Sequence, residues 1–199
     1  MPNPSEFRAT DTSPFSPAEL LAAAVRLGCE VAALRAVSEV EAPNGGFIPD
    51  GRPELLFESH TFHEQTGGKY DASHPDISTA VWVHNYGAEG AHQYDRLDRA
   101  IQLDRHAALM SASWGKYQIM GFNYVECGYD NVEDLVADMC VSESYQLDAF
   151  VAYMQNTDCG TYLAAKNWTE FARAYNGSGQ VTLYADKLAA AYEHYHSQE

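Results

Sequence analysis

Segments with helical periodicity make up most of this chain, and a stretch rich in glycine and proline interrupts them once. Apolar residues recur at helical spacing over residues 17–41 and again over residues 92–195. Residues 43–60 instead hold two clusters of turn-forming residues around Phe47 and Ile48. With 199 residues, of which 46% are apolar, the chain can bury one sizeable core. The pattern predicts a mainly α fold: a single helical domain with a small β or extended insertion around residues 43–60.

Helix start and stop signals indicate where the elements lie. Ser16, Pro17 and Glu19 form a capping box, so a helix should run from Pro17 to about Leu27 and end at Gly28. The apolar triplet Leu55–Phe57 favours a strand. Further helices are expected at residues 30–41, 59–66, 92–104, 105–110, 122–127, 132–141, 143–156, 168–175 and 180–195.

The remaining segments are expected to lack regular structure. Residues 1–15, rich in proline, serine and threonine, predict a loose N-terminal arm ahead of a domain over residues 16–199. Residues 67–89 are predicted to form a long irregular stretch, and loops of that length in a compact domain are usually functional.

The charge balance excludes whole classes of partner. Lys and Arg number 12 against 28 Asp and Glu, a net charge of −16, so the chain has no basic face for nucleic acid or an anionic membrane. The first residues lack a basic start followed by an apolar run, so we expect synthesis in the bacterial host cytoplasm without a signal peptide. No apolar run approaches the ~20 residues of a membrane-spanning helix. The cysteines form no paired motif, and we expect reduced, mostly buried thiols at Cys29, Cys127, Cys140 and Cys159.

A glutamate on the apolar face of a helix is the first candidate for chemistry. On a helical wheel that starts at Val31, Glu41 at about 280° lies between Leu34 at about 300° and Val37 at about 240°. Burial and the negative end of the helix dipole both disfavour a carboxylate there, so Glu41 should keep its proton near neutral pH, as a general acid must. The alternative is a glutamate at a frayed helix end that reaches water.

A neighbouring glutamate on the same helix has an ordinary environment. Glu39 follows Arg35 by one turn on the opposite, solvated face, where the two are expected to form an ion pair.

A second carboxylate follows the predicted strand. Glu58 comes directly after Leu55–Phe57, and two carboxylates that flank a cleft are the minimum for most glycoside hydrolysis. A salt bridge from Glu58 to Arg52 is the structural alternative.

The residues after Glu58 also allow another interpretation. His60, His63 and Glu64 are possible zinc ligands, but their spacing matches no known zinc-peptidase motif, so we expect no metal. A Gly-x-Ser-x-Gly elbow for a serine nucleophile is absent from the sequence.

Several stretches of the chain resemble the phage and prophage N-acetylmuramidases that serve as endolysins. The resemblance extends over about residues 18–196. It is carried by residues 33–41, 46–47, 51–62, 66–78, 93–97, 108–124, 171–177 and 184–192. Two of these segments, around Ser113 to Gln118 and Tyr175-Asn176-Gly177, also resemble patterns of the wider lysozyme-like superfamily, which includes the lytic transglycosylases.

The resemblance implies a lysozyme-like α+β fold and a set of site residues. Glu41 would be the catalytic acid and Glu58 the second carboxylate, with no cofactor. The residues expected to line the glycan cleft are Ser113, Tyr117, Gln118, Tyr175 and Asn176.

The expected function is an endolysin-type N-acetylmuramidase that cleaves the β-1,4 bond between MurNAc and GlcNAc. Its partner would be peptidoglycan glycan strands. The enzyme would act on them as a monomer, in the periplasm or cell wall, after its release. Three alternatives stay open: a lytic transglycosylase that yields 1,6-anhydromuramyl products, a zinc-dependent peptidase that uses His60 and His63, and a catalytically dead wall-binding module.

Overall fold

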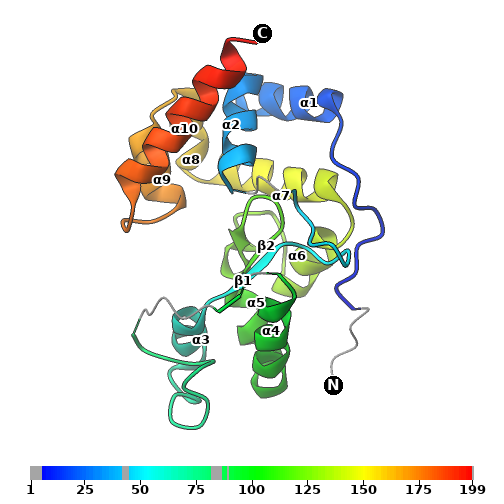
Figure 1. Ribbon diagram of the computed structural model, residues 1–199, viewed down its shortest axis with the longest axis vertical. Coiled ribbons are helices and arrows are strands. Elements are labelled where there is room, and N and C mark those ends of the chain that lie inside the picture. Colours follow the sequence, from blue (N-terminus) through cyan, green and yellow to red (C-terminus); the bar gives the residue numbers. More distant parts are fainter. Residues whose placement is uncertain (1–5, 42–44, 82–86, 89, 199) are drawn as a thin grey trace.

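The computed structural model describes residues 6–41, 45–81, 87–88 and 90–198. Helices dominate, and they lie on either side of α7, which crosses the middle of the molecule (Figure 1). In chain order the elements are α1 (Pro17–Leu27), α2 (Val31–Glu41), β1 (Leu55–Phe57), α3 (Ser59–Thr66), α4 (Ala91–Leu103), α5 (Arg105–Met110), β2 (Ala112–Trp114), β3 (Ile119–Met120), a 3₁₀ turn (Gly121–Asn123), α6 (Val132–Met139), α7 (Glu143–Asn156), α8 (Cys159–Ala164), α9 (Trp168–Tyr175) and α10 (Val181–His196).

The helix signals in the sequence agree with the structure. The Ser16 side chain accepts a hydrogen bond from the Glu19 N–H, and Glu19 Oε2 accepts one from the Ser16 N–H at 2.7 Å. Gly28 ends α1 in the left-handed conformation. The mainly α fold with a small sheet is confirmed.

The sheet is built differently from the prediction. Only β1 comes from the expected insertion, where Phe47 and Pro53 also form a single bridge. The partners β2 and β3 come from residues 112–120, in the antiparallel order β1-β2-β3 with Leu56 opposite Ser113. All three residues of β2 are buried, so the polar–apolar alternation that identifies a strand is missing there. Residues 42–44 of the insertion lie outside the described residues, as do residues 82–86 and 89 of the irregular stretch.

Two helical segments also differ from expectation. The helix predicted at residues 122–127 is wrong: only the 3₁₀ turn Gly121–Asn123 forms, followed by turns. Helix α8 was not predicted, because Gly160 in its first turn is a poor helix former. A Cβ on Gly160 would lie 2.3 Å from the Met154 carbonyl oxygen, so glycine is required where α8 approaches α7.

Residues 6–15 form no helix or strand, but they are fastened to the domain. Phe7 is buried against Tyr94 and Trp114. The Ala9 N–H donates to the Gly51 carbonyl at 2.7 Å, and residues 10 and 11 donate to the carbonyls of residues 140 and 141. The segment is therefore anchored rather than loose over its described length. The rest of the predicted arm, residues 1–5, lies outside the described residues.

Helix α2 lies between helices α1 and α10. Its small residues Ala32, Ala33 and Ala36 are fully buried, which lets its neighbours approach closely. Helix α10 packs along α2 and also against α9, while α1 touches α2 from the other side (Figure 1). The helix that ends in Glu41 is therefore held on several faces.

A glutamine of α7 joins the loop after α2 to the β2–β3 turn. Gln146 Oε1 accepts the Lys116 N–H at 2.7 Å, and Nε2 donates to the carbonyls of Met139 and Gly46 at 3.0 and 3.3 Å. A Cβ on Gly46 would lie 2.2 Å from Gln146 Oε1, so only glycine allows this approach. Buried Glu143 adds a bond from the Gly46 N–H at 2.7 Å and an ion pair with Lys116.

Candidate active site

One cleft of about 660 Å³ collects nearly all of the predicted site residues. Its walls come from the end of α2, the sheet with α3, and the α9–α10 region. The lining residues are Val40, Glu41, Leu56, Glu58, His60, Thr61, Glu64, Ser113, Gln118, Met120, Phe122, Asn123, Tyr153, Ala174, Tyr175, Asn176, Gly177 and Tyr184.

Glu41 is the last residue of α2, and its side chain enters the cleft. Burial raises the pKa of Glu41 to about 7, although a hydrogen bond from Asn176 Nδ2 at 2.9 Å and the charge of Lys187 both lower it. The expectation from the helical wheel, a carboxyl group that keeps its proton near neutrality, is confirmed. At mildly acidic pH the group can donate a proton.

Glu58 links β1 to α3 and lines the same cleft. Its N–H donates to the Ser111 carbonyl at 2.9 Å, which fixes the backbone beside the sheet. Its Oε2 accepts a hydrogen bond from Thr61 Oγ1 at 3.2 Å and lies 3.3 Å from His60 Nε2. The alternative pairing with Arg52 does not form, because the Arg52 guanidinium binds Asp50 and lies over the Tyr94 ring.

The β2–β3 turn presents two of the predicted polar residues. Ser113 Oγ donates to Gln118 Oε1 at 2.9 Å, and Gln118 Nε2 donates to the Gly115 carbonyl at 2.9 Å. Gln118 has a φ of +47°, a conformation that costs free energy in a residue with a side chain. The tight turn and these two bonds hold the Gln118 amide at the cleft.

The end of α9 supplies the residues opposite the turn. Tyr175 is stacked on Phe171, and its hydroxyl donates to the Tyr117 carbonyl at 2.5 Å. Asn176 follows, with its Nδ2 on Glu41. Its buried Oδ1 has no hydrogen-bond partner among the described residues, so it is free to accept one from a ligand.

The prediction that Tyr117 lines the cleft is wrong. Its side chain is 1% exposed, stacks on Phe150 and forms a hydrogen bond with Ser38 at 3.0 Å. Residue 117 of the turn points into the core, whereas Gln118, with its positive φ, points into the cleft. Tyr117 therefore supports Tyr175 through its carbonyl group.

Several cleft residues were not predicted as ligand-binding residues. Tyr153, Tyr184 and Phe122 add aromatic surface, and His60 and Thr61 flank Glu58. Tyr184 lies in the first turn of α10, which begins beside Glu41. No local sequence signal indicated that these two elements meet.

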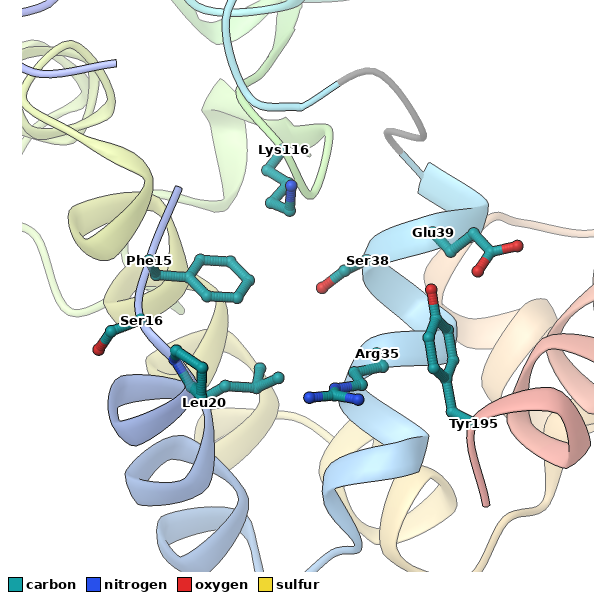
Figure 2. Close-up of a pocket in the computed structure, with 9 residues that line it drawn as sticks. Phe15, Ser16, Leu20, Arg35, Ser38, Glu39, Lys116 and Tyr195 are labelled. Carbon is teal, nitrogen blue, oxygen red and sulfur yellow. The ribbon is translucent and has the colours of Figure 1, made fainter. Parts of the chain in front are cut away.

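A second hollow lies behind α2 and does not include Glu41. This pocket of about 390 Å³ lies between Arg35, Phe15, Lys116 and Tyr195 (Figure 2). The expected ion pair of Arg35 with Glu39 does not form in the described structure. The Arg35 guanidinium lies over the Tyr195 ring, and a hydrogen bond with Glu39 raises the pKa of Tyr195.

The zinc interpretation has no support in the geometry. His63 Nδ1 lies 2.7 Å from Asp71 Oδ2, so it is directed away from His60, which lies beside Glu58. Within the described ranges, no group of three or more His, Cys, Asp or Glu residues could hold a metal ion. The cysteines are free thiols: Cys127, Cys140 and Cys159 are buried and Cys29 partly so. Over the same residues, no helix is both long and apolar enough to cross a membrane.

Comparisons with known proteins show the family of the chain. The family model described as N-acetylmuramidase matches residues 30–196. Among solved structures, the crystal structure of Burkholderia AP3 phage endolysin matches with a TM-score of 0.84 and 38% sequence identity, over 94% of this chain and 73% of that one. No curated protein matches the chain. With a matching family model over most of its length, this chain belongs to the N-acetylmuramidase family and is a peptidoglycan-degrading enzyme.

Proposed function

We propose that the protein hydrolyses the β-1,4 bond between MurNAc and GlcNAc in peptidoglycan glycan strands, without a cofactor. The observation that carries the proposal is Glu41, whose pKa is raised to about 7 by burial, in the same cleft as Glu58. One carboxyl group that keeps its proton and a second in the same cleft are the parts that glycoside hydrolysis requires.

In the proposed reaction, protonated Glu41 gives its proton to the glycosidic oxygen as the bond from that oxygen to C1 of MurNAc breaks. GlcNAc leaves with a free 4-hydroxyl group. The oxygen of a water molecule bonds to C1, and its proton passes to Glu58 or to solvent. Glu58 acts either as base toward that water or as counter-charge to the oxocarbenium-like transition state.

The other cleft residues suit a sugar polymer. Tyr153 and Tyr184 offer aromatic faces and polar hydroxyl groups, which match the apolar and polar sides of a pyranose. Asn176 Oδ1 and the Gln118 amide can bind hydroxyl or N-acetyl groups. We propose that Ser113, Gln118, Tyr175 and Asn176 bind the glycan, and that a monomer acts in the cell wall after release from the cytoplasm.

Replacement of the proposed acid tests the function directly. Glu41→Gln should lower the rate of wall lysis by at least about 100-fold, because the amide cannot donate a proton to the leaving group. Circular dichroism should show an unchanged fold. Near-normal lysis by this variant would contradict the assignment of Glu41.

Product analysis separates hydrolysis from its closest rival. A lytic transglycosylase uses the 6-hydroxyl of MurNAc instead of water and leaves 1,6-anhydromuramyl ends. Mass spectrometry of digested peptidoglycan should show reducing-end MurNAc. A dominant anhydro product would establish the rival, and loss of activity in EDTA would instead indicate a metal peptidase.

A further inference from the structure

Two side chains at the start of α3 meet one oxygen of Glu58. Thr61 Oγ1 donates to Glu58 Oε2 at 3.2 Å, and His60 Nε2 lies 3.3 Å from the same oxygen. The two groups also lie 3.5 Å from each other, so the three form a small cluster. The other oxygen, Oε1, has no hydrogen-bond partner within the described part of the chain.

The local backbone explains why Glu58 depends on these neighbours. Glu58 stands at the N-cap position of α3 in the extended conformation usual there, but its carboxylate caps no backbone N–H. Its Oε2 instead contacts two side chains of the first turn, and the residue lines the cleft. A free glutamate side chain has several rotamers of similar free energy, and the hydrogen bond from Thr61 together with the close contact of His60 at one oxygen restricts it to few.

Thr61 and His60, the two neighbours of the Glu58 carboxylate, are buried to different extents. Thr61 is 3% exposed, so its hydroxyl group has a fixed place, and the side chain of His60 is 27% exposed and lines the cleft. The other histidine of the helix, His63, has its own partner in Asp71 and does not line the cleft. The two histidines of α3 thus have separate surroundings.

We propose that His60 and Thr61 are positioning residues that hold Oε2 of Glu58 and so turn Oε1 toward the sugar. The inference rests on the proposed function, in which Glu58 acts on water or on the developing positive charge. Both roles need an ionised carboxylate in one orientation, and neither requires His60 to touch the substrate. Misplacement of a reacting group by about 1 Å can lower a rate by roughly 100-fold.

Paired substitutions at each residue test the proposal. Thr61→Val and His60→Leu remove the hydrogen-bonding group and keep the approximate shape, whereas Thr61→Ser and His60→Gln keep a donor at a similar reach. We expect Thr61→Val and His60→Leu each to lower kcat on soluble glycan fragments by about 10-fold or more with KM within about twofold, and the conservative variants to recover most of the loss.

A double-mutant cycle with Glu58→Ala separates positioning from direct catalysis. If His60 acts only through Glu58, His60→Leu should have no further effect on the residual activity of Glu58→Ala. An equal loss in both backgrounds would show that His60 acts on the substrate itself, and would overturn the proposal.

Thr66→Val provides a matched control on the same helix. The Thr66 hydroxyl group bonds only the carbonyls of Phe62 and His63, and Thr66 lies outside the cleft, so kcat should be unchanged. Thermal unfolding of each variant shows whether a loss of kcat reflects a loss of fold.

The outcomes distinguish this inference from the proposed function. If Glu58→Ala is inactive while His60→Leu and Thr61→Val are fully active, positioning is refuted and the role of Glu58 stands. If Glu58→Ala itself has wild-type activity, the role of Glu58 fails, and the inference fails with it.

Discussion

A carboxyl group keeps its proton near neutrality only where the protein makes the charged form costly. Glu41 meets this condition because burial at the end of α2 outweighs the two groups that favour its ionised form, Asn176 and Lys187. Nearby hydroxyl groups respond to the same charge: burial and ionised Glu41 both raise the pKa of Tyr175 and of Tyr184. The site therefore has a stability cost that should be measurable.

Glu41→Gln should be more stable than the wild type in alkaline solution. Folding raises the pKa of Glu41 from 4.5 to about 7. Protonated Glu41 therefore contributes stability that is fully present below pH 4.5 and is lost as the pH rises through 7. Above pH 8 the variant should gain at most about 3 kcal/mol in the free energy of unfolding. Urea denaturation at pH 4 and pH 8 checks this, and an equal gain at both pH values would contradict it.

Lys187→Met should shift the alkaline limb of the pH–rate profile upward. The Lys187 charge lowers the pKa of Glu41, so its removal should let the acid keep its proton to higher pH. Lys187→Arg retains the charge and serves as the control. An unmoved limb in Lys187→Met would show that Glu41 does not control it. In the wild type we expect optimal activity at about pH 5–6 and a decline through pH 7.

Single residues were predictable where one local pattern decided their environment. The helical wheel placed Glu41 between apolar side chains, and the structure confirms its shifted pKa. The direction of the Tyr117 side chain was not predictable. Neighbouring residues of a tight turn can point one into the core and the next into the cleft, and no sequence pattern indicates the positive φ of Gln118. His60 and Thr61 lie close to Glu58 in the sequence, yet only the structure shows that both contact its Oε2.

At the scale of elements, caps and periodicity identified the longer helices and the apolar triplet identified β1, whereas strands β2 and β3 were missed. Strands β2 and β3 have three and two residues, too few for a period to show. The pairing of β2 with β1 joins segments more than 50 residues apart, which no local signal reports. The cleft depends on this pairing, because it brings Ser113 opposite Leu56, two residues before Glu58.

Gln146→Leu should weaken the connection between the loop after α2 and the β2–β3 turn. The substitution leaves the Lys116 N–H and the Met139 carbonyl without their Gln146 partner, and it leaves the Gly46 carbonyl with only the Glu54 N–H, which should cost roughly 3 kcal/mol of unfolding free energy. Gln155→Leu is the matched control on the same helix, because Gln155 is exposed and makes one bond to the Arg26 carbonyl. Urea unfolding measures both, and equal effects would refute the role of Gln146.

At the scale of the whole molecule, a net charge of −16 governs how the enzyme meets its substrate. Much of the positive charge is already paired with carboxylates, as at Arg26, Arg99, Arg105, Lys166 and Arg173. Stem-peptide carboxylates in the wall should therefore repel the protein at long range, and contacts within the cleft must supply the binding.

Moderate salt should accelerate lysis of intact walls. At about 0.15 M ionic strength, charges are screened beyond about 8 Å, so the repulsion falls while contacts in the cleft persist. A soluble glycan without peptides is the control, and its hydrolysis should not depend on salt. A lytic rate that falls steadily as salt is added would contradict the repulsion.

The packing of α10 along α2 also determines when, during synthesis, Glu41 acquires its raised pKa. Glu41 leaves the ribosome early, but Asn176, Tyr184 and Lys187, which set its environment, are translated more than 130 residues later. Until then nothing from α9 or α10 covers its carboxyl group, which ionises as in any solvated glutamate. A nascent chain that still lacks these helices carries Glu41 as an ordinary ionised carboxylate at neutral pH, and the proton that catalysis needs is retained only once α9 and α10 have packed around it.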